Sequence, residues 1–289
     1  MAGTTTLLRL VRAGTLFSPA ADALAGRCLV AGASGAIWDA DGLRLMAASA
    51  LVYAGGMVCN DVADVAEDTR NRPERPIPSG AISRPLAAVL GFALLLGGAA
   101  TSPAPMHHAL LAALVLVYDF AAKRVVLLGA LVMGSLRGLN LLSGAALAGG
   151  TVSTPVLSAA LCYAVYVFAI TILGSFEEDR TVRPRAVAAL QGAPMWAALG
   201  GLLAVQDGLW PAPAIALLPV LWLARRNRAI ANWGQAEIRA SMGYLLLGTM
   251  LYTGLLCLAA GRTAECAGIL ACIPLARAVT RRLRLLSMT

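Results

Sequence analysis

Charged residues are scarce in this chain. Asp, Glu, Lys and Arg make up 13% of the 289 residues, whereas 59% are hydrophobic. Because soluble domains carry about 25% charged residues, this composition excludes a soluble enzyme and indicates a polytopic membrane protein. No polar linker divides the apolar runs, so we expect one domain that covers residues 1–289.

Cysteine pairs and histidine clusters are also missing. None of the six cysteines stands in a C-x-x-C pair and nearly all lie in apolar runs, which favours inert buried thiols over disulfides or a metal cluster. The two histidines, His107 and His108, are adjacent at the start of an apolar segment, and we assign them no metal. The net charge is +8. The arginines stand at segment ends, so membrane topology explains this charge and we expect no nucleic-acid partner.

Ten apolar segments predict an all-α bundle of membrane helices. Two of them, 106–121 and 210–224, are short for a bilayer, so we expect about nine transmembrane helices. Short connections favour an up-and-down arrangement. The ten segments are 14–37, 43–60, 85–101, 106–121, 125–148, 154–176, 187–204, 210–224, 241–260 and 263–278.

The distribution of positive charge predicts the orientation. If the N-terminus faces the cytoplasm, the cytoplasmic segments carry all but four of the 23 Lys and Arg residues. The four that fall elsewhere are Arg27, Arg44, Arg137 and Arg262. The positive-inside rule therefore places the N-terminus and the polar loops described next on the cytoplasmic side of a bacterial-type inner or plasma membrane.

A cluster of acids ends the second apolar segment. Residues 60–68 read N-D-V-A-D-V-A-E-D, and this spacing places Asp61, Asp64 and Asp68 on one face of a helix. Like charges so close repel each other unless a divalent cation lies among them. Acids at a C-terminal helix end also oppose the helix dipole, which disfavours a purely structural role in pairing with the arginines that follow. We therefore predict a Mg²⁺ site on these carboxylates.

Two further polar loops fall on the same side of the membrane, Y-D-F-A-A-K-R at 118–124 and S-F-E-E-D-R at 175–180. Acids beside cations suit a Mg²⁺-bound diphosphate. If the diphosphate is allylic, electrostatic stabilisation of the leaving group opens the C–O bond, and an isoprenoid tail lies between the apolar helices. Lys123, the only lysine in the chain, suits a phosphate contact, with a topological anchor as the alternative. The acids at 177–179 have pairing with neighbouring arginines as their alternative role.

Two polar residues interrupt the apolar segment 125–148. Arg137 and Asn140 stand about one turn apart, and an intramembrane arginine normally faces a cavity or a charged partner. We expect them to contact the substrate, either diphosphate or acceptor, or an acid of the cytoplasmic cluster. In the first apolar segment, pairing of Asp22 with Arg27 or with other neighbours is the simplest prediction.

The motifs together resemble a known family. N-D-x-x-D-x-x-x-D followed by R-P-x-R-P-I-P-S-G resembles the first signature of the UbiA superfamily of intramembrane prenyltransferases, and Y-D-F-A-A-K-R resembles that family's tyrosine-to-lysine segment. The resemblance implies a bundle of helices around a lipid-open central cavity. It also implies Mg²⁺-dependent transfer of a prenyl group from a polyprenyl diphosphate donor to a small, often aromatic, acceptor.

The resemblance implies the roles of the residues in the first two motifs, whereas those of Arg137, Asn140 and the third loop are expected from their own positions, with Glu178 as the alternative to Glu177. The expected metal ligands are Asp61, Asp64, Asp68, Glu177 and Asp179. The expected contacts to the substrate diphosphate are Asn60, Arg72, Tyr118, Lys123, Arg137, Asn140 and Arg180. Lys123 is also expected to act in catalysis with the three acids of the first motif.

The second motif departs from the family pattern. The family shows D-x-x-x-D, whereas this chain has Ser175 at the first position and Asp179 at the second, which leaves one or two metal ions open. This weakened motif and the block 118–144 look most similar to the EboC-like branch. The alternative function is a non-catalytic isoprenoid- or lipid-binding membrane subunit derived from such an enzyme.

Overall fold

The fold is an all-α bundle, as predicted. The computed structural model describes residues 3–149, 151–176, 184–205, 211–230 and 233–285. The helices in these ranges are α1 (Thr4–Leu10), the short 3₁₀ helix η1 (Ala13–Thr15), α2 (Phe17–Ala31), α3 (Ala40–Ala63), α4 (Val65–Asn71), α5 (Arg84–Thr101), α6 (Pro105–Phe120), the 3₁₀ helix η2 (Ala122–Arg124), α7 (Val126–Leu141), α8 (Ser143–Leu147), α9 (Thr154–Ser175), α10 (Pro184–Val205), α11 (Pro211–Arg228), α12 (Gln235–Ala259) and α13 (Thr263–Leu285).

Each of the ten predicted apolar segments contains a helix, but not all of these helices reach spanning length. Within the described residues, seven are long and apolar enough to cross a bilayer, namely α3, α5, α6 with η2, α9, α10, α12 and α13. The segment 106–121 is among them because η2 extends it to Arg124. The helices α2, α7 and α11 are shorter or less apolar, so the predicted number of about nine is higher than the seven candidate spans.

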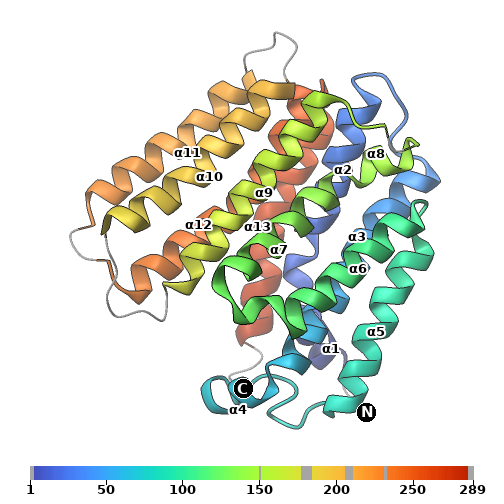
Figure 1. Ribbon diagram of the computed structural model, residues 1–289, viewed down its shortest axis with the longest axis vertical. Helices are drawn as coiled ribbons and strands as arrows, with labels where there is room; N and C mark the ends of the chain where they lie inside the picture. Colours follow the sequence, from blue (N-terminus) through green and yellow to red (C-terminus); the bar gives the residue numbers. More distant parts are fainter. Residues whose placement is uncertain (1–2, 150, 177–183, 206–210, 231–232, 286–289) are drawn as a thin grey trace.

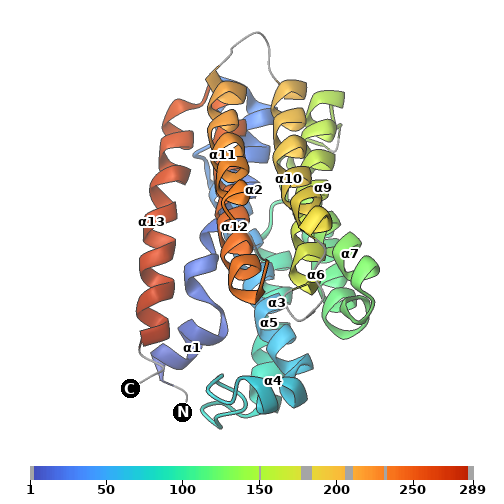
Figure 2. The ribbon, with the colours of Figure 1, turned by 90° about the vertical axis from the view of Figure 1, so that its left-hand side faces the viewer.

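The first described helix and the end of the last one lie at the same end of the bundle. Figures 1 and 2 show α1, α4 and the end of α13 together there, and α8 at the opposite end. At the α8 end, the Asp39 side chain caps α3 by accepting a hydrogen bond of 2.7 Å from the Gly42 amide. This bond, with help from Arg27, lowers the pKa of the Asp39 carboxyl below its usual value.

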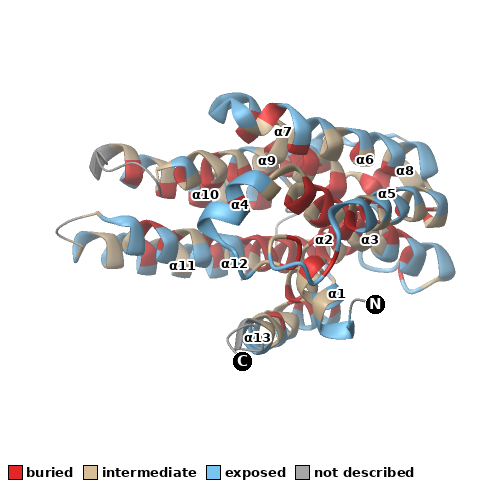
Figure 3. Cartoon of the chain, turned by 90° about the horizontal axis from the view of Figure 1, so that it is seen from below, coloured by how far each residue is buried: buried red, intermediate tan, exposed pale blue. Residues whose placement is uncertain are grey.

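The core lies where the helices face each other. Seen along the bundle in Figure 3, buried residues line the inner faces of the helices and exposed ones lie outside. Many exposed residues are large and apolar, such as Leu96 and Met106, as expected for surfaces in contact with lipid.

Small residues let the helices that carry the polar core approach closely. A Cβ atom at Gly26 on α2 would overlap the carbonyl of Leu141 on α7, and one at Gly144 would overlap the backbone of α2. Small residues at such crossings are how membrane helices pack closely. This contact brings the polar residues of α2 opposite those of α7.

Candidate active site

The acidic motif lies at a break between two helices rather than on one. The helix α3 ends at Ala63, Asp64 is its C-cap at φ −91° and ψ 8°, and α4 begins at Val65. The expectation of a continuous helical face is therefore wrong. Asp61 and Asp68 are buried, at 4% and 1% exposure, whereas Asp64 is half-buried.

Arg75 joins the two buried acids. Its Nη1 lies 3.3 Å from Asp61 Oδ1 and 2.6 Å from Asp68 Oδ2. Arg12, from the turn after α1, reaches Asp61 Oδ1 at 3.0 Å. Arg72, the predicted phosphate contact, is half exposed and lies 3.8 Å from Asp68. Neither Arg12 nor Arg75 was predicted from the sequence as a site residue.

Lys123 joins the first and second polar loops, which the charge pattern predicted to lie on the same side of the membrane. Its Nζ lies 2.6 Å from Asp64 Oδ1 and donates to Asn60 Oδ1 at 3.0 Å. Asn60 Nδ2 in turn donates to Asp64 Oδ2 at 3.0 Å. These three residues form a closed triangle between the end of α3 and η2. The predicted residues of the third loop, Glu177, Glu178, Asp179 and Arg180, lie outside the described residues.

A fourth acid, which was not predicted as a site residue, stands beside this cluster. Asp119 on α6 is 4% exposed. Its Oδ2 is buried and has no hydrogen-bond partner among the residues that the structure describes. An unpaired buried carboxylate oxygen is costly, so Asp119 marks a place that a ligand would satisfy. An aspartate inside the apolar segment 106–121 was the sequence signal for it.

The donor set at the α3 tip fits Mg²⁺ in kind. Carboxylate and amide oxygens are the ligands that this ion takes, together with water and phosphate. Among the described residues, no three Asp, Glu, His or Cys side chains are grouped closely enough to hold a metal. The acids of the tip are instead paired with Arg75, Arg12 and Lys123. The same three cations suit phosphate oxygens. When a Mg²⁺-diphosphate binds, the acids would therefore turn to the metal and the cations to the phosphate oxygens.

A cavity of about 80 Å³ opens beside the cluster. Tyr118 and Asp119 line it from α6, Tyr53 from α3, and Arg137 and Asn140 from α7. The remaining lining is mostly apolar, for example Leu111, Val115, Met133 and Leu136. The cavity therefore connects the second polar loop with the polar residues in the middle of the bundle.

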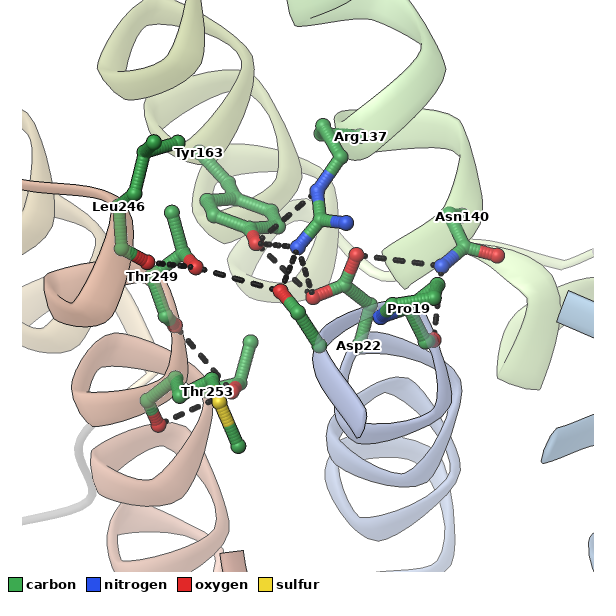
Figure 4. A network of polar contacts seen from close by, with 10 residues as sticks. Pro19, Asp22, Arg137, Asn140, Tyr163, Leu246, Thr249 and Thr253 are labelled. Atoms are coloured by element: carbon green, nitrogen blue, oxygen red, sulfur yellow. Dashed lines mark hydrogen bonds and ion pairs between the residues drawn. The ribbon is translucent and has the colours of Figure 1, made fainter. Parts of the chain in front are cut away.

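Arg137 and Asn140 belong to a second polar network, shown in Figure 4. Arg137 Nη2 lies 3.0 Å from Asp22 Oδ1 and also donates to the hydroxyls of Ser18 and Tyr163. Tyr163 donates to Asp22 Oδ1 at 2.8 Å, and Asn140 Nδ2 donates to Asp22 Oδ2 at 3.1 Å. The acid that pairs with Arg137 is thus Asp22, and not an acid of the cytoplasmic cluster as predicted.

Asp22 and Arg27 do not pair with each other, and each pairs with another neighbour, which was the second alternative predicted. Arg27 Nη2 lies 2.8 Å from Asp39 Oδ2 at the α8 end of the bundle. Asp22 is left to Arg137 because the close crossing of α2 and α7 sets the two side chains opposite each other.

A second and larger cavity, of about 380 Å³, lies between α9, α10, α11, α12 and α13. Its lining is apolar and aromatic, including Tyr166, Trp222, Tyr244 and Tyr252, with Arg277 at its border. Within the described residues, two separate cavities therefore stand in place of the single central cavity that was predicted. The smaller one is next to the acids.

The comparison with family models decides the family. The model of the UbiA prenyltransferase family matches residues 22–247. The chain belongs to this family. Solved structures agree on the fold: a UbiA homolog from Archaeoglobus fulgidus bound to GPP and Mg²⁺ superposes with a TM-score of 0.64 at 16% identity, covering 92% of this chain and 99% of that one.

The curated relatives of this UbiA family member include digeranylgeranylglyceryl phosphate synthases. The enzyme of Methanoregula boonei is 52% identical over 85 residues, which are 28% of this chain and 30% of that protein. The enzyme of Methanoculleus marisnigri is 40% identical over 112 residues, 37% of this chain and 40% of that protein. The chain thus spans well under half the length of these relatives, and they do not support the EboC-like branch specifically.

Proposed function

We propose that this protein is a Mg²⁺-dependent prenyltransferase that moves the prenyl group of a polyprenyl diphosphate onto an acceptor hydroxyl. The observation that carries the proposal is a set of ion pairs beside the smaller cavity: Arg75 pairs with Asp61 and Asp68, and Lys123 pairs with Asp64. The cluster holds acids for a metal and cations for phosphate oxygens in one place, which a structural anchor does not need.

The roles follow from these positions. Asp61, Asp64 and Asp68 hold Mg²⁺, with Glu177 and Asp179 of the third loop as further proposed ligands. Lys123, Asn60 and Tyr118 contact the diphosphate from the α3–η2 side, and Arg72, Arg75 and Arg180 from the loops. Bound Mg²⁺ supplies neutralisation of the diphosphate charge, which makes it a better leaving group.

The chemistry is a substitution at the allylic carbon. The bond between this carbon and the diphosphate oxygen breaks, and the diphosphate leaves with the electron pair. The acceptor oxygen supplies the pair for the new C–O bond, and its proton passes to the released diphosphate. Lys123 stabilises the charge that develops on the oxygens of the leaving diphosphate. The apolar helices exclude water from the positively charged allylic carbon.

We propose a glyceryl phosphate lipid as the acceptor. The relatives are named for a product that carries two geranylgeranyl groups on glyceryl phosphate, so an acceptor that carries one such group fits. The second candidate is that the chain belongs to the EboC-like branch and uses the acceptor of that branch. By the positive-inside rule, the α3 tip faces the cytoplasm.

The test is transfer of radiolabelled geranylgeranyl diphosphate to geranylgeranylglyceryl phosphate by the purified protein in membranes. The proposal expects a lipid product and released diphosphate, both lost on chelation of Mg²⁺ and restored by its addition. If the donor binds tightly but no diphosphate is released with any acceptor tested, the protein is instead a non-catalytic lipid-binding subunit.

A further inference from the structure

Arg137 presents one edge of its guanidinium to the smaller cavity. Its Nε and Nη2 are fully engaged by Ser18, Asp22 and Tyr163. Within the part of the chain that the structure describes, no residue accepts a hydrogen bond from Nη1, and Figure 4 shows this nitrogen turned away from the three partners. Two N–H donors of a buried cation are therefore available to a ligand.

Asn140 offers a complementary group on the same helix. Its Nδ2 is held by Asp22 and by the carbonyl of Pro19, which fixes the orientation of the amide. Its Oδ1 then points the other way, with no partner drawn in Figure 4. Arg137 and Asn140 both line the cavity, so a donor edge and an acceptor atom lie on one wall.

Asp22 holds this pair in place without competing for the ligand. Its carboxylate accepts from Arg137, Tyr163 and Asn140 and is fully buried. A carboxylate with this many donors has few lone pairs left. The network is therefore a support for the free edge of Arg137, in the way that a second layer of hydrogen bonds orients groups that bind a ligand.

Asp119 also lines this cavity, and among the described residues its buried Oδ2 has no hydrogen-bond partner. A cavity of about 80 Å³ has room for several waters or a small polar head group. A ligand with an oxyanion at one end and a hydroxyl at the other satisfies both walls. The oxyanion meets Arg137, and the hydroxyl donates to Asp119 on the side of the diphosphate cluster.

We propose that Arg137 and Asn140 form the head-group site of the acceptor, an alcohol whose reacting hydroxyl faces Asp119. The free edge of the Arg137 guanidinium binds a phosphate or similar oxyanion, and Asn140 Oδ1 accepts a hydrogen bond from the P–OH of the same, singly protonated group. This inference rests on the proposed function and assigns Arg137 and Asn140 to the acceptor instead of the donor diphosphate. Recognition of an oxyanion by a planar, buried guanidinium is stronger and more directional than by a point charge.

The first test compares two acceptors with the wild-type protein: geranylgeranylglyceryl phosphate and geranylgeranylglycerol, which lacks the phosphate. The inference expects the kcat/KM for the phosphate-bearing acceptor to be higher by about 10-fold or more, the value of a charge-assisted hydrogen bond. Equal kcat/KM values overturn it. This arm needs no variant, so it does not depend on whether a variant folds.

The second test uses Arg137→Lys with Tyr163→Phe as the matched control. Both changes disturb the same network, but Tyr163 does not line the smaller cavity. We expect Arg137→Lys to raise the KM for the phosphate-bearing acceptor about 10-fold and to remove the preference for phosphate, with the KM for the donor unchanged. Tyr163→Phe should keep that preference. Equal losses in both variants, or a change confined to the donor KM, overturn the inference.

These outcomes separate the inference from the proposed function. If the wild-type protein shows no Mg²⁺-dependent transfer to either acceptor, the proposed function fails. If it transfers to both acceptors equally, or if Arg137→Lys keeps the preference for phosphate, the function stands and the head-group site is wrong.

Discussion

The two polar constellations of this bundle are built in different ways. At the α3 tip, the cations are partly exposed, with side-chain exposures of 36% for Arg12, 21% for Arg75 and 19% for Lys123. In the middle of the bundle, Arg137 and Asp22 are exposed by 12% and 1%. The tip pairs can be reached by water and by a ligand, whereas the central pair is enclosed by three helices.

This difference teaches which ion pairs can exchange. Solvent weakens the pairs at the tip, so a metal and a diphosphate can replace them at small cost. The central pair is largely shielded from solvent, and loss of one partner leaves a charge uncompensated. We therefore expect loss of the Asp22 carboxylate at the centre to cost the most stability, and loss of Asp64 or Lys123 at the tip to act mainly on turnover and donor binding.

The largest expected effect is at the centre. Asp22→Ala leaves Arg137 buried without its anion and should lower the free energy of unfolding by about 3–5 kcal/mol, measured by chemical unfolding in detergent. Asp41→Ala is the matched control because its pair with Arg44 is half exposed and should cost about 1 kcal/mol or less. Similar losses in the two variants would remove the distinction between enclosed and exposed pairs.

The next effect is at the tip. Asp64→Ala should lower kcat about 100-fold or more, because a ligand of the charge-stabilising site is lost, while the melting curve stays close to that of the wild type. Glu67→Ala, at an exposed position on α4, should retain activity. Full Mg²⁺-dependent activity in Asp64→Ala would contradict the metal role. The readout is release of diphosphate from the donor.

A smaller effect is expected at the residue that joins the two loops. Lys123→Ala should raise the KM for the prenyl donor about 10-fold, the value of one charge-assisted contact. The KM for the acceptor should be unchanged, and both constants come from the same transfer assay. A rise confined to the acceptor KM would count against a role in holding the diphosphate.

The smallest effect separates two neighbouring arginines. Arg72→Ala should change the free energy of unfolding by about 0.5 kcal/mol or less, because the Arg72 side chain is half exposed and its Nη1 lies 3.8 Å from Asp68. Arg75→Ala removes the bridge between two buried acids and should destabilise more. Parallel unfolding curves measure this, and the opposite order would show that the loop arginines are paired differently with ligand bound.

The sequence predicted the parts of the fold that depend on local pattern. Apolar runs located the helices, and the acids at 61–68 with Lys123 located the tip, because charge at the end of an apolar segment is visible in one dimension. The break at Asp64 was missed because the spacing of three and four residues fits a helix on either side of it.

The partners of the acids depend on how distant segments meet, which spacing does not encode. Arg75 reaches Asp61 only because the proline-rich loop folds back on α3. Arg12 reaches it from a turn in which Arg12 itself takes a left-handed backbone conformation, at φ 50°, a rare one for a side-chain-bearing residue. The pairing of Arg137 with Asp22 depends in the same way on the close crossing at Gly26.

Lys123 carries the only side-chain amine of the protein, and that amine lies in the triangle with Asp64 and Asn60. Acylation by an amine-selective reagent, read at the lysine separately from the α-amine of the chain, would therefore report on a single side chain without any need for mutagenesis. A donor that shields this nitrogen would slow the modification in proportion to its occupancy, so the chain has a built-in footprint for ligand binding at the helix tip.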